Sequence, residues 1–361
     1  MPGYLETTTT PLNYKSEASG RHFLRKKPTS MSNPLTELLN ERDYLLADGA
    51  TGTNMMAMGL PVGQAPDLWN LKAPEKVTQL HTGFLEAGAD ILLTNTFSSN
   101  QYRLCLDEAQ HLTSDINVAA ARLARSACES VDRPVIVAGS MGPSGELMEP
   151  HGTMDHEAAV AAFTEQANAL AEGGVDIIWI ETIFAFDELL AAATAAASTG
   201  LPVASTMTFD TAGRTMMGNT PEQASDYMKS TLPPLTAYGA NCGAGPSMLV
   251  DTISKFSQCA AENDIIIAKG NCGIPQSIGG EIVYSGDDET MWHYARLVRD
   301  CGARIIGGCC GTTPARLNTI ARALKDYTPG STPSEATIEA VLGPIQKSKN
   351  RSKRGNPRRK T

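Results

Sequence analysis

One three-part pattern recurs along most of the chain and restricts the folds open to it: an apolar run, a glycine-rich or polar loop, and an alanine-rich amphipathic segment. The apolar runs predict buried strands, and the amphipathic segments predict helices. The eight predicted strands cover residues 44–47, 91–93, 135–138, 177–180, 203–207, 238–240, 265–268 and 304–306. The predicted helices cover residues 74–87, 102–130, 155–172, 187–197, 221–229, 247–261, 288–300 and 314–324. Such alternation favours a parallel sheet.

Eight repeats over roughly 285 residues favour closure of this sheet into a single (β/α)8 TIM barrel, with an open doubly wound sheet as the alternative. The polar and glycine-rich loops follow the strands, on the face where such barrels carry their active sites. We assign residues 1–32 to an N-terminal extension, 33–328 to the barrel, and 329–361 to a linker and basic tail. Both extensions are expected to be disordered.

The net charge of −9 conceals an acidic body with basic ends. Residues 1–30 carry five basic and two acidic side chains, or +3, and residues 346–361 carry eight basic and no acidic ones, or +8. Removing these contributions from −9 leaves −20 for the remainder. An acidic body argues against a nucleic-acid-binding core. The basic tail leaves RNA or anionic lipid as the alternative partner.

No apolar run approaches the ~20 residues that span a membrane, and the N-terminus lacks the apolar segment of a signal peptide. We therefore expect a cytoplasmic protein with no membrane partner. Eight cysteines in 361 residues are too few for a disulfide scaffold and indicate free thiols or metal ligation. The sequence leaves open whether the protein is a monomer or a homo-oligomer.

Three cysteines lie where predicted strands end. Cys309 and Cys310 are adjacent in RIIGGCCGTTP, and Cys242 lies in AYGANCGAG. Neighbouring thiols form a disulfide only with strain, but they can bind one soft metal together. Three thiolates at about 2.3 Å from zinc (Zn2+) leave a fourth position open for a substrate. Because a zinc-bound thiol is deprotonated, such a centre is suited to activating a substrate thiol as a nucleophile.

Two alternatives remain for these cysteines. All three could be buried core residues, since free cysteine is often buried. Cys272 in GNCGIP also follows a predicted strand, so it could be a ligand or simply line the barrel mouth.

A second group of strand-end residues is suited to binding an amino acid. Asp48 ends the first predicted strand, and Gly49, Ala50 and Thr51 after it can offer backbone N–H groups to a carboxylate. Glu181 ends the fourth strand and can accept hydrogen bonds from an ammonium group. Together with a thiol-activating zinc, these residues predict an amino-thiol substrate.

Two other functions are compatible with parts of the chain. Lys269 ends the seventh predicted strand, where a lysine could form the Schiff base of a lyase. A structural ion pair or a solvent-facing position is the favoured interpretation of this lysine, because a Schiff base leaves the three cysteines unexplained. A non-catalytic zinc- or RNA-binding protein acting through the basic tail is the other alternative.

The chain resembles the homocysteine S-methyltransferase family over residues 33–324. Its markers DGATGT, TNTF, GANCG and GGCCGT occur in the family's order. The resemblance implies that Cys242, Cys309 and Cys310 hold zinc and that the sulfur of L-homocysteine takes the open position. Asp48, with the loop after it, and Glu181 would bind the amino-acid end of the substrate. The product would be L-methionine.

The methyl donor is less clear from the resemblance. In general appearance the chain resembles bacterial betaine–homocysteine methyltransferases, yet animal betaine enzymes carry tyrosines where Ser98 and Thr182 stand. TNTFSSN and IETIF are instead similar to the homocysteine-binding domain of cobalamin-dependent methionine synthase. Trp69 and Phe97 are available to contact a quaternary ammonium. Betaine, S-methylmethionine and a methylated corrinoid protein, supplied as a separate partner, all remain candidates.

Overall fold

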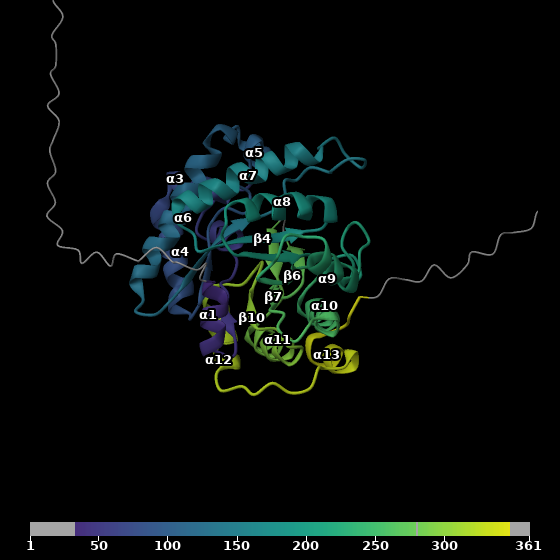
Figure 1. Ribbon diagram of the computed structural model, residues 1–361. Helices are drawn as coiled ribbons and strands as arrows, with labels where there is room; N and C mark the ends of the chain where they lie inside the picture. The colour runs from purple at the N-terminus through teal and green to yellow at the C-terminus, as the bar shows by residue number, and fades with distance from the viewer. Residues whose placement is uncertain (1–32, 279–280, 347–361) are drawn as a thin grey trace, which may run out of the picture. The chain divides into compact units, whose positions relative to one another are not determined.

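Eight parallel strands form the closed barrel that the repeat predicts (Figure 1). The computed structural model describes residues 33–278 and 281–346, so the disorder and binding roles predicted for residues 1–32 and 347–361 lie outside the described residues. The strand order is β1-β10-β7-β6-β5-β4-β3-β2. The barrel closes where Ala47 pairs with Ile91 and the Asp48 N–H donates to the Ile91 carbonyl at 3.1 Å.

The barrel strands are β1 (Leu45–Leu46), β2 (Ile91–Leu93), β3 (Ile136–Met141), β4 (Ile177–Ile183), β5 (Val203–Met207), β6 (Ala237–Cys242), β7 (Ile266–Gly270) and β10 (Ile305–Gly308). The helices that cover them are α4 (Pro74–Glu86), α6 (Thr113–Ala127), α7 (His156–Gly173), α8 (Phe186–Ser198), α9 (Pro221–Ser230), α10 (Pro246–Cys259), α11 (Asp288–Asp300) and α12 (Pro314–Leu324). The shorter helices are α1 (Pro34–Glu41), α2 (Gly52–Ala57), α3 (Trp69–Lys72), α5 (Gln101–Leu104) and α13 (Glu335–Leu342), and the 3-10 turns are Pro66–Leu68, Cys105–Asp107, Gln110–Leu112 and Cys128–Ser130.

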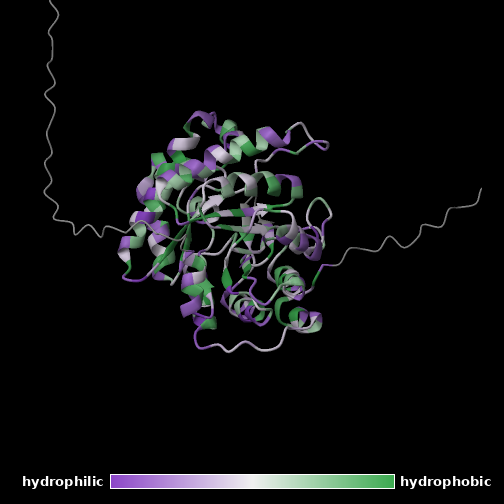
Figure 2. Ribbon diagram, viewed as in Figure 1, coloured by the Kyte–Doolittle hydropathy of each residue, from purple (hydrophilic) through white to green (hydrophobic). Residues whose placement is uncertain are grey.

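The strands are buried on both faces, which explains why they are continuous apolar runs rather than alternating ones. In β4, Ile177 and Trp179 belong to the apolar cluster inside the barrel, whereas Ile178 and Ile180 pack against the surrounding helices. Figure 2 shows hydrophobic residues concentrated in the central strands, while the helices carry hydrophilic residues as well. Side chains that continue the inward series at the ends of the strands are therefore presented to the barrel mouth.

Helix α1 covers the opposite end of the barrel, and the repeat does not predict it. Its side chains Leu35, Leu38 and Leu39 belong to the cluster inside the barrel. The Asn33 carboxamide accepts a hydrogen bond from the Leu35 N–H at 3.2 Å, and Arg304 Nη2 donates to the Leu39 carbonyl at 2.7 Å. Both ends of this short helix are therefore satisfied by specific partners.

Two more elements depart from the predicted repeat. An antiparallel hairpin of β8 (Pro275–Ile278) and β9 (Glu281–Tyr284) is inserted between β7 and α11. Helix α13 lies within the segment predicted as a linker and tail, and its Ile338 is buried in the outer apolar layer. The hairpin places Tyr284 beside Cys310.

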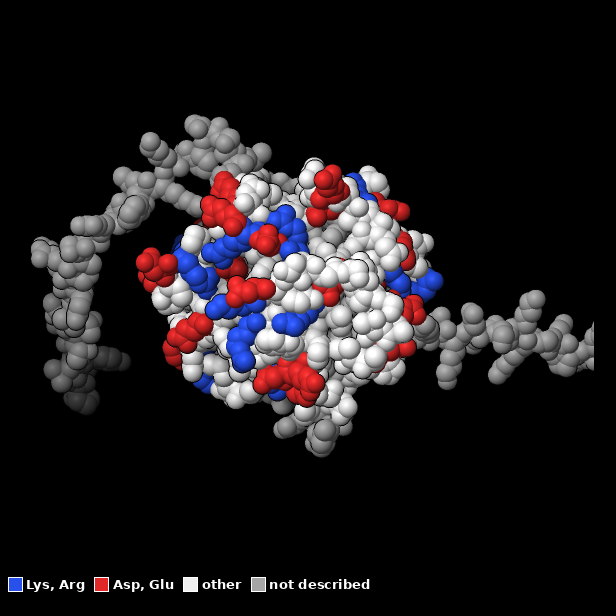
Figure 3. All heavy atoms as spheres, turned by 90° about the horizontal axis from the view of Figure 1, so that it is seen from below, with Lys and Arg blue, Asp and Glu red and all other residues white. Residues whose placement is uncertain are grey.

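On the face shown in Figure 3, lysine and arginine side chains are interspersed with aspartate and glutamate among the described residues. That face therefore offers no broad area of positive charge of the kind that binds nucleic acid.

Within residues 33–278 and 281–346, no helix combines the length and the apolar character needed to cross a membrane.

We predict that Leu35→Ala lowers the free energy of unfolding by about 2–5 kcal/mol, because it opens a cavity under the barrel core. Leu35 is fully buried, whereas Leu106 is 75% exposed. The matched variant Leu106→Ala is expected to stay within about 0.5 kcal/mol of the parent. Urea unfolding followed by circular dichroism measures both. Equal stability of the two variants would show that α1 is not part of the barrel core.

Candidate active site

The three predicted cysteines meet at the carboxyl ends of β6 and β10. Both strands pair with β7, and Cys242 and Gly308 are each opposite Gly270 (Figure 1). The Cys309 N–H donates to the Gly270 carbonyl at 2.6 Å, which fixes the backbone as it leaves β10. The Sγ atoms of Cys242 and Cys310 are 4.0 Å apart, and all three Sγ atoms lie within 4.8 Å of one another. Sulfur atoms bound tetrahedrally to zinc at about 2.3 Å are roughly 3.8 Å apart, so the spacing fits one such ion.

The backbone around these cysteines has positive φ angles at several residues, among them Cys242 and Gly311. Cys242 itself has φ of +62°, a left-handed conformation that costs a non-glycine residue on the order of 1–3 kcal/mol. Gly311, directly after Cys310, has φ of +77°, and a Cβ there would lie 2.5 Å from Tyr284 Cγ. The glycine therefore lets the hairpin pack against the cysteine loop. The left-handed backbone of Cys242 occurs where its Sγ atom meets those of Cys309 and Cys310.

The proximity of the thiols opposes their ionisation. The hydrogen bond with Cys309, together with burial, raises the pKa of the Cys242 thiol. The hydrogen bond with Cys242 raises the pKa of Cys310 to about 11. Three sulfur atoms this close cannot all be thiolates at neutral pH unless a cation balances their charge. The donor set therefore fits a soft divalent metal ion.

Cys272 does not belong to this cluster. Its Sγ donates to the Gly286 carbonyl at 3.4 Å, inside the loop that follows the hairpin. It is buried, and it is not among the cysteines that come within 4.8 Å of one another in the described part of the chain. A packing role accounts for it.

A buried ion pair lies beside the cysteines. Lys269 Nζ is 2.8 Å from Asp48 Oδ1, and both side chains are 2% exposed. The other Asp48 oxygen, Oδ2, accepts the Leu93 N–H at 2.8 Å, so this carboxylate has partners at both oxygens. The Lys269 ammonium also lies over the ring of Trp179, 5.6 Å from its centroid.

This environment keeps Lys269 charged. Although burial disfavours the ammonium form, the carboxylates of Asp48 and Glu181 raise the pKa of Lys269 above its ordinary value. A Schiff base requires the neutral amine. Lys269 thus forms the ion pair that the sequence analysis favoured, and its ammonium form argues against the lyase alternative.

Two carboxylates line the active-site cavity, Glu181 and Asp67, and Asp67 Oδ1 already accepts hydrogen bonds from the Ser98 N–H and the Ser99 hydroxyl. Glu181 is 8% exposed, and its Oε1 accepts a hydrogen bond from Ser140 Oγ at 2.6 Å. Burial raises the pKa of Glu181, while Lys269 and the Ser140 hydroxyl act in the opposite direction. A cationic group brought into the cavity would stabilise the ionised form of this carboxylate.

These groups surround one cavity of about 290 Å³ at the barrel mouth. All the predicted site residues except Asp48 line it: Gly49, Ala50, Thr51, Glu181, Cys242, Cys309 and Cys310. Asp48 lies behind the lining, where it forms an ion pair with the lining residue Lys269. The Ala50 N–H already donates to the Thr312 carbonyl at 3.1 Å. No hydrogen bond from the N–H group of Gly49 or Thr51 is found within the described residues.

Several polar residues of the site were not predicted. Asn241, Asn271 and Ser140 are buried among the cysteines and Glu181, and Tyr284 comes from the unpredicted hairpin. Asn241 continues the inward series of β6, so strict alternation could have revealed it. Nothing in the sequence signals the position of Tyr284, because the hairpin does not belong to the repeat.

A sequence profile described as homocysteine S-methyltransferase matches residues 45–324, which is most of the chain. The chain belongs to the homocysteine S-methyltransferase family. It is therefore a methyltransferase that acts on homocysteine, as the resemblance implied. The match covers all eight barrel units and includes the three clustered cysteines.

Solved structures with the same fold include the homocysteine methyltransferase MmuM from Escherichia coli. Its metallated form is 24% identical with a TM-score of 0.68, over 80% of this chain and 100% of that chain. Its oxidized form has the same identity and TM-score, over 81% and 99%. Its apo form is 23% identical with a TM-score of 0.63, over 81% and 100%. At this level of identity the similarity shows a shared barrel.

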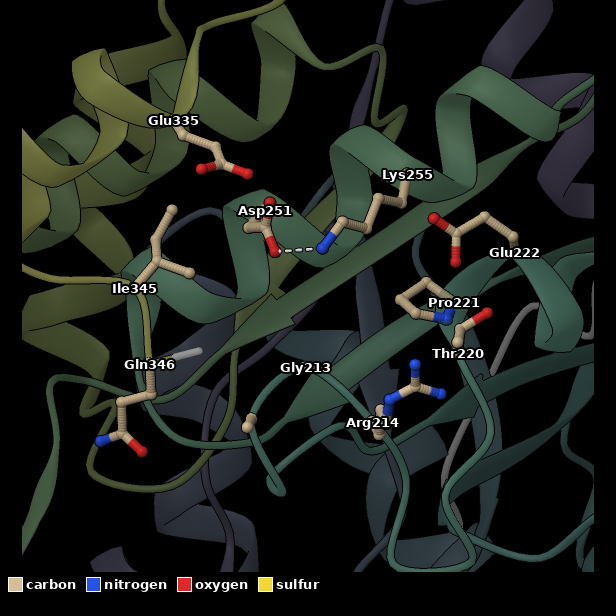
Figure 4. Close-up of a pocket in the computed structure, with 11 residues that line it drawn as sticks. Gly213, Arg214, Thr220, Pro221, Glu222, Asp251, Lys255, Glu335, Ile345 and Gln346 are labelled. Atoms are coloured by element: carbon tan, nitrogen blue, oxygen red, sulfur yellow. Dashed lines mark hydrogen bonds and ion pairs between the residues drawn. The ribbon is translucent and has the colours of Figure 1, made fainter. Parts of the chain in front are cut away.

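A second cavity, of about 310 Å³, lies among the loop after β5, the start of α9, and helices α10 and α13 (Figure 4). Lys255 and Asp251 form an ion pair of 2.6 Å within it, and Arg214 donates to the Gly218 carbonyl at 2.9 Å. None of the predicted site residues lines this cavity. It is separate from the cysteine cluster.

We predict that Lys269→Met lowers the free energy of unfolding by about 3–5 kcal/mol, because it leaves the buried Asp48 carboxylate without its cation. The double variant Asp48→Asn/Lys269→Met is expected to recover part of that loss, since it removes the unpaired charge as well. Urea unfolding measures the three proteins. If Lys269→Met were as stable as the parent, the ion pair would have no structural role.

Proposed function

We propose that the protein is a zinc-dependent homocysteine S-methyltransferase that forms L-methionine. The observation that carries this proposal is the meeting of three Sγ atoms, within 4.8 Å, at the wall of a cavity that also contains the Glu181 carboxylate. The cavity thus combines a site for a thiol-binding metal with a site for an ammonium group. Homocysteine carries both functional groups.

In this proposal Cys242, Cys309 and Cys310 are the zinc ligands. When bound there, zinc would lower the pKa of the homocysteine thiol, so that its sulfur is a thiolate at neutral pH. Three soft sulfur donors favour zinc over magnesium or calcium, which prefer oxygen ligands.

The remaining residues would hold the amino-acid end of the substrate. Glu181, oriented by Ser140, accepts hydrogen bonds from the ammonium group, and the N–H groups of Gly49 and Thr51 donate to the carboxylate. Asp48 contributes by fixing Lys269 at the cavity wall. The thiol proton leaves to solvent when the sulfur becomes a thiolate. The sulfur then forms a bond to the methyl carbon as the bond between that carbon and the donor breaks, and the donor departs with the electron pair of that bond. Positioning supplies much of the acceleration in such a transfer.

The cavity offers little for a quaternary ammonium donor. Phe97 is the aromatic residue among the described residues that line it. Trp69 is buried outside this lining, and the Lys76 ammonium lies 4.4 Å from its ring centroid. Recognition of a quaternary ammonium typically uses several aromatic faces. S-methylmethionine is also a methylated cation, but it carries an amino-acid group that polar side chains can bind, and a methylated corrinoid protein needs no such cation site. We therefore propose one of these two donors rather than betaine.

We predict that Cys309→Ala and Cys310→Ala each lose bound zinc, and that methionine formation falls on the order of 100-fold or more, because a ligand is removed. Metal content by atomic emission spectroscopy and methionine by chromatography test this. The matched control is Cys272→Ala, whose thiol lies outside the cluster and which should keep its zinc. Full activity in a metal-free Cys309→Ala/Cys310→Ala double variant would falsify the zinc mechanism.

We predict that betaine is the poorest of three methyl donors. Purified zinc-loaded protein with homocysteine would be offered betaine, S-methylmethionine and a methylated corrinoid protein in turn, and methionine would be measured. Because Phe97 is the aromatic residue in the described lining, and a quaternary ammonium is typically bound by several aromatic rings, the rate with betaine should be at least about tenfold below that with the best donor. A rate with betaine equal to or above the other two would contradict this assignment of the donor.

A further inference from the structure

Asn241 lies directly before Cys242 in β6 and contacts both halves of the active site. Its side chain is fully buried. Asn241 Oδ1 accepts the Thr182 N–H at 2.9 Å, and Asn241 Nδ2 donates to Thr182 Oγ1 at 2.7 Å. The same Nδ2 is 3.7 Å from Cys309 Sγ. One carboxamide therefore joins the end of β4, beside Glu181, to a cysteine that follows β10.

The orientation of this carboxamide is fixed by chemistry. The Thr182 N–H can only donate, so it must face the amide oxygen rather than the amide nitrogen. With the oxygen assigned, the nitrogen faces Thr182 Oγ1 and Cys309 Sγ. Its two hydrogens then have one acceptor each. The Cys309 sulfur is thus the acceptor of an N–H···S hydrogen bond, a role that suits a thiolate.

Asn241 also compensates for an irregularity in the barrel. The pairing of β4 with β5 shifts register between Ile180 and Ile183, so Glu181 and Thr182 lie in a bulge. Thr182 has φ of +64°, a conformation that β-branched residues rarely adopt. Because a bulged residue is left without its strand partner, its N–H requires another acceptor. Asn241 provides that acceptor.

We propose that Asn241 is a positioning residue that couples the amino-acid site to the metal site, an inference that rests on the proposed zinc function. Its amide N–H stabilises the Cys309 thiolate, and its carbonyl holds the Thr182 backbone so that Glu181 faces the cavity. The substrate's ammonium and sulfur are then bound by parts of one hydrogen-bonded unit. A displacement of Thr182 or of Cys309 would therefore be passed to the other residue through the Asn241 side chain.

Three variants separate the two roles. Asn241→Ala removes all three contacts. Asn241→Asp keeps an oxygen for the Thr182 N–H but loses the donor to Cys309, and it preserves the fold if the alanine variant does not. Thr182→Val is the matched control, because it removes only the hydroxyl acceptor, retains a β-branched side chain at φ of +64°, and leaves the N–H···S bond in place.

The readout is the absorption of protein loaded with Co(II) in the thiolate-to-metal charge-transfer region. An N–H···S bond lowers the energy of the sulfur electrons, so its loss moves the band to lower energy. We expect this shift in Asn241→Ala and Asn241→Asp, and the parent band in Thr182→Val. In chelator competition, the affinity of Asn241→Ala for Co(II) should fall roughly 10- to 100-fold. The KM for homocysteine should rise more in Asn241→Ala than in Asn241→Asp, which keeps the Thr182 contact.

The outcomes distinguish this inference from the function on which it rests. A parent protein that binds no Co(II) would overturn the proposed metal function itself. A parent that binds Co(II), with folded Asn241→Ala and Asn241→Asp variants that share its band energy, would overturn the role of Asn241 alone. A band shift in Thr182→Val equal to that of Asn241→Ala would also overturn it, because the sulfur contact would then not be the cause.

Discussion

The buried ion pair between Lys269 and Asp48 is the interaction on which the active site depends. It links β7 to the end of β1, on either side of the strand that leads to Cys309 and Cys310. Two carboxylates, Asp48 and Glu181, face this one ammonium, and three thiols lie beside them. When the thiols ionise, the single positive charge of Lys269 cannot balance the two carboxylates and the thiolates together. In the proposed function, the additional positive charge would come from a divalent metal at the sulfur atoms and from an ammonium group at Glu181.

The barrel explains how residues far apart in sequence supply this charge arrangement. Parallel strands end at the same face, so the ends of β4, β6, β7 and β10 present Glu181, Cys242, Lys269 and the pair Cys309 and Cys310 to the mouth. The adjacent cysteines follow a strand that pairs directly with β7, and β6 pairs with the other edge of β7. Cys242 and the cysteine pair are thus brought together across one intervening strand. Cys309 and Cys310 lie just past β10, and the bond from the Cys309 N–H to the Gly270 carbonyl holds the start of their loop against β7.

Much of this arrangement is predictable because it follows the strand–helix repeat. The repeat predicts the barrel, and the strand ends predict that Cys242, Cys309 and Cys310 share one face. Position along a strand does not show which polar groups pair with one another, so the direct contact between Asp48 and Lys269 is not apparent from sequence. Trp69 illustrates the same limit: its ring is available by composition, but Lys76 covers it in the fold. The hairpin that carries Tyr284 interrupts the repeat and leaves no periodic signal.

Two of the five non-glycine residues with positive φ among the described residues lie at the site. Thr182 and Cys242 both adopt left-handed backbone conformations at strand ends, with φ of +64° and +62°. Each would cost on the order of 1–3 kcal/mol if it were not held by its surroundings. Asn241 lies between them, bonded to the first through its carboxamide and to the second through the chain. Both left-handed residues adjoin side chains that line the cavity, since Thr182 follows Glu181 and Cys242 itself is a lining residue, and Asn241 contacts or adjoins both of them.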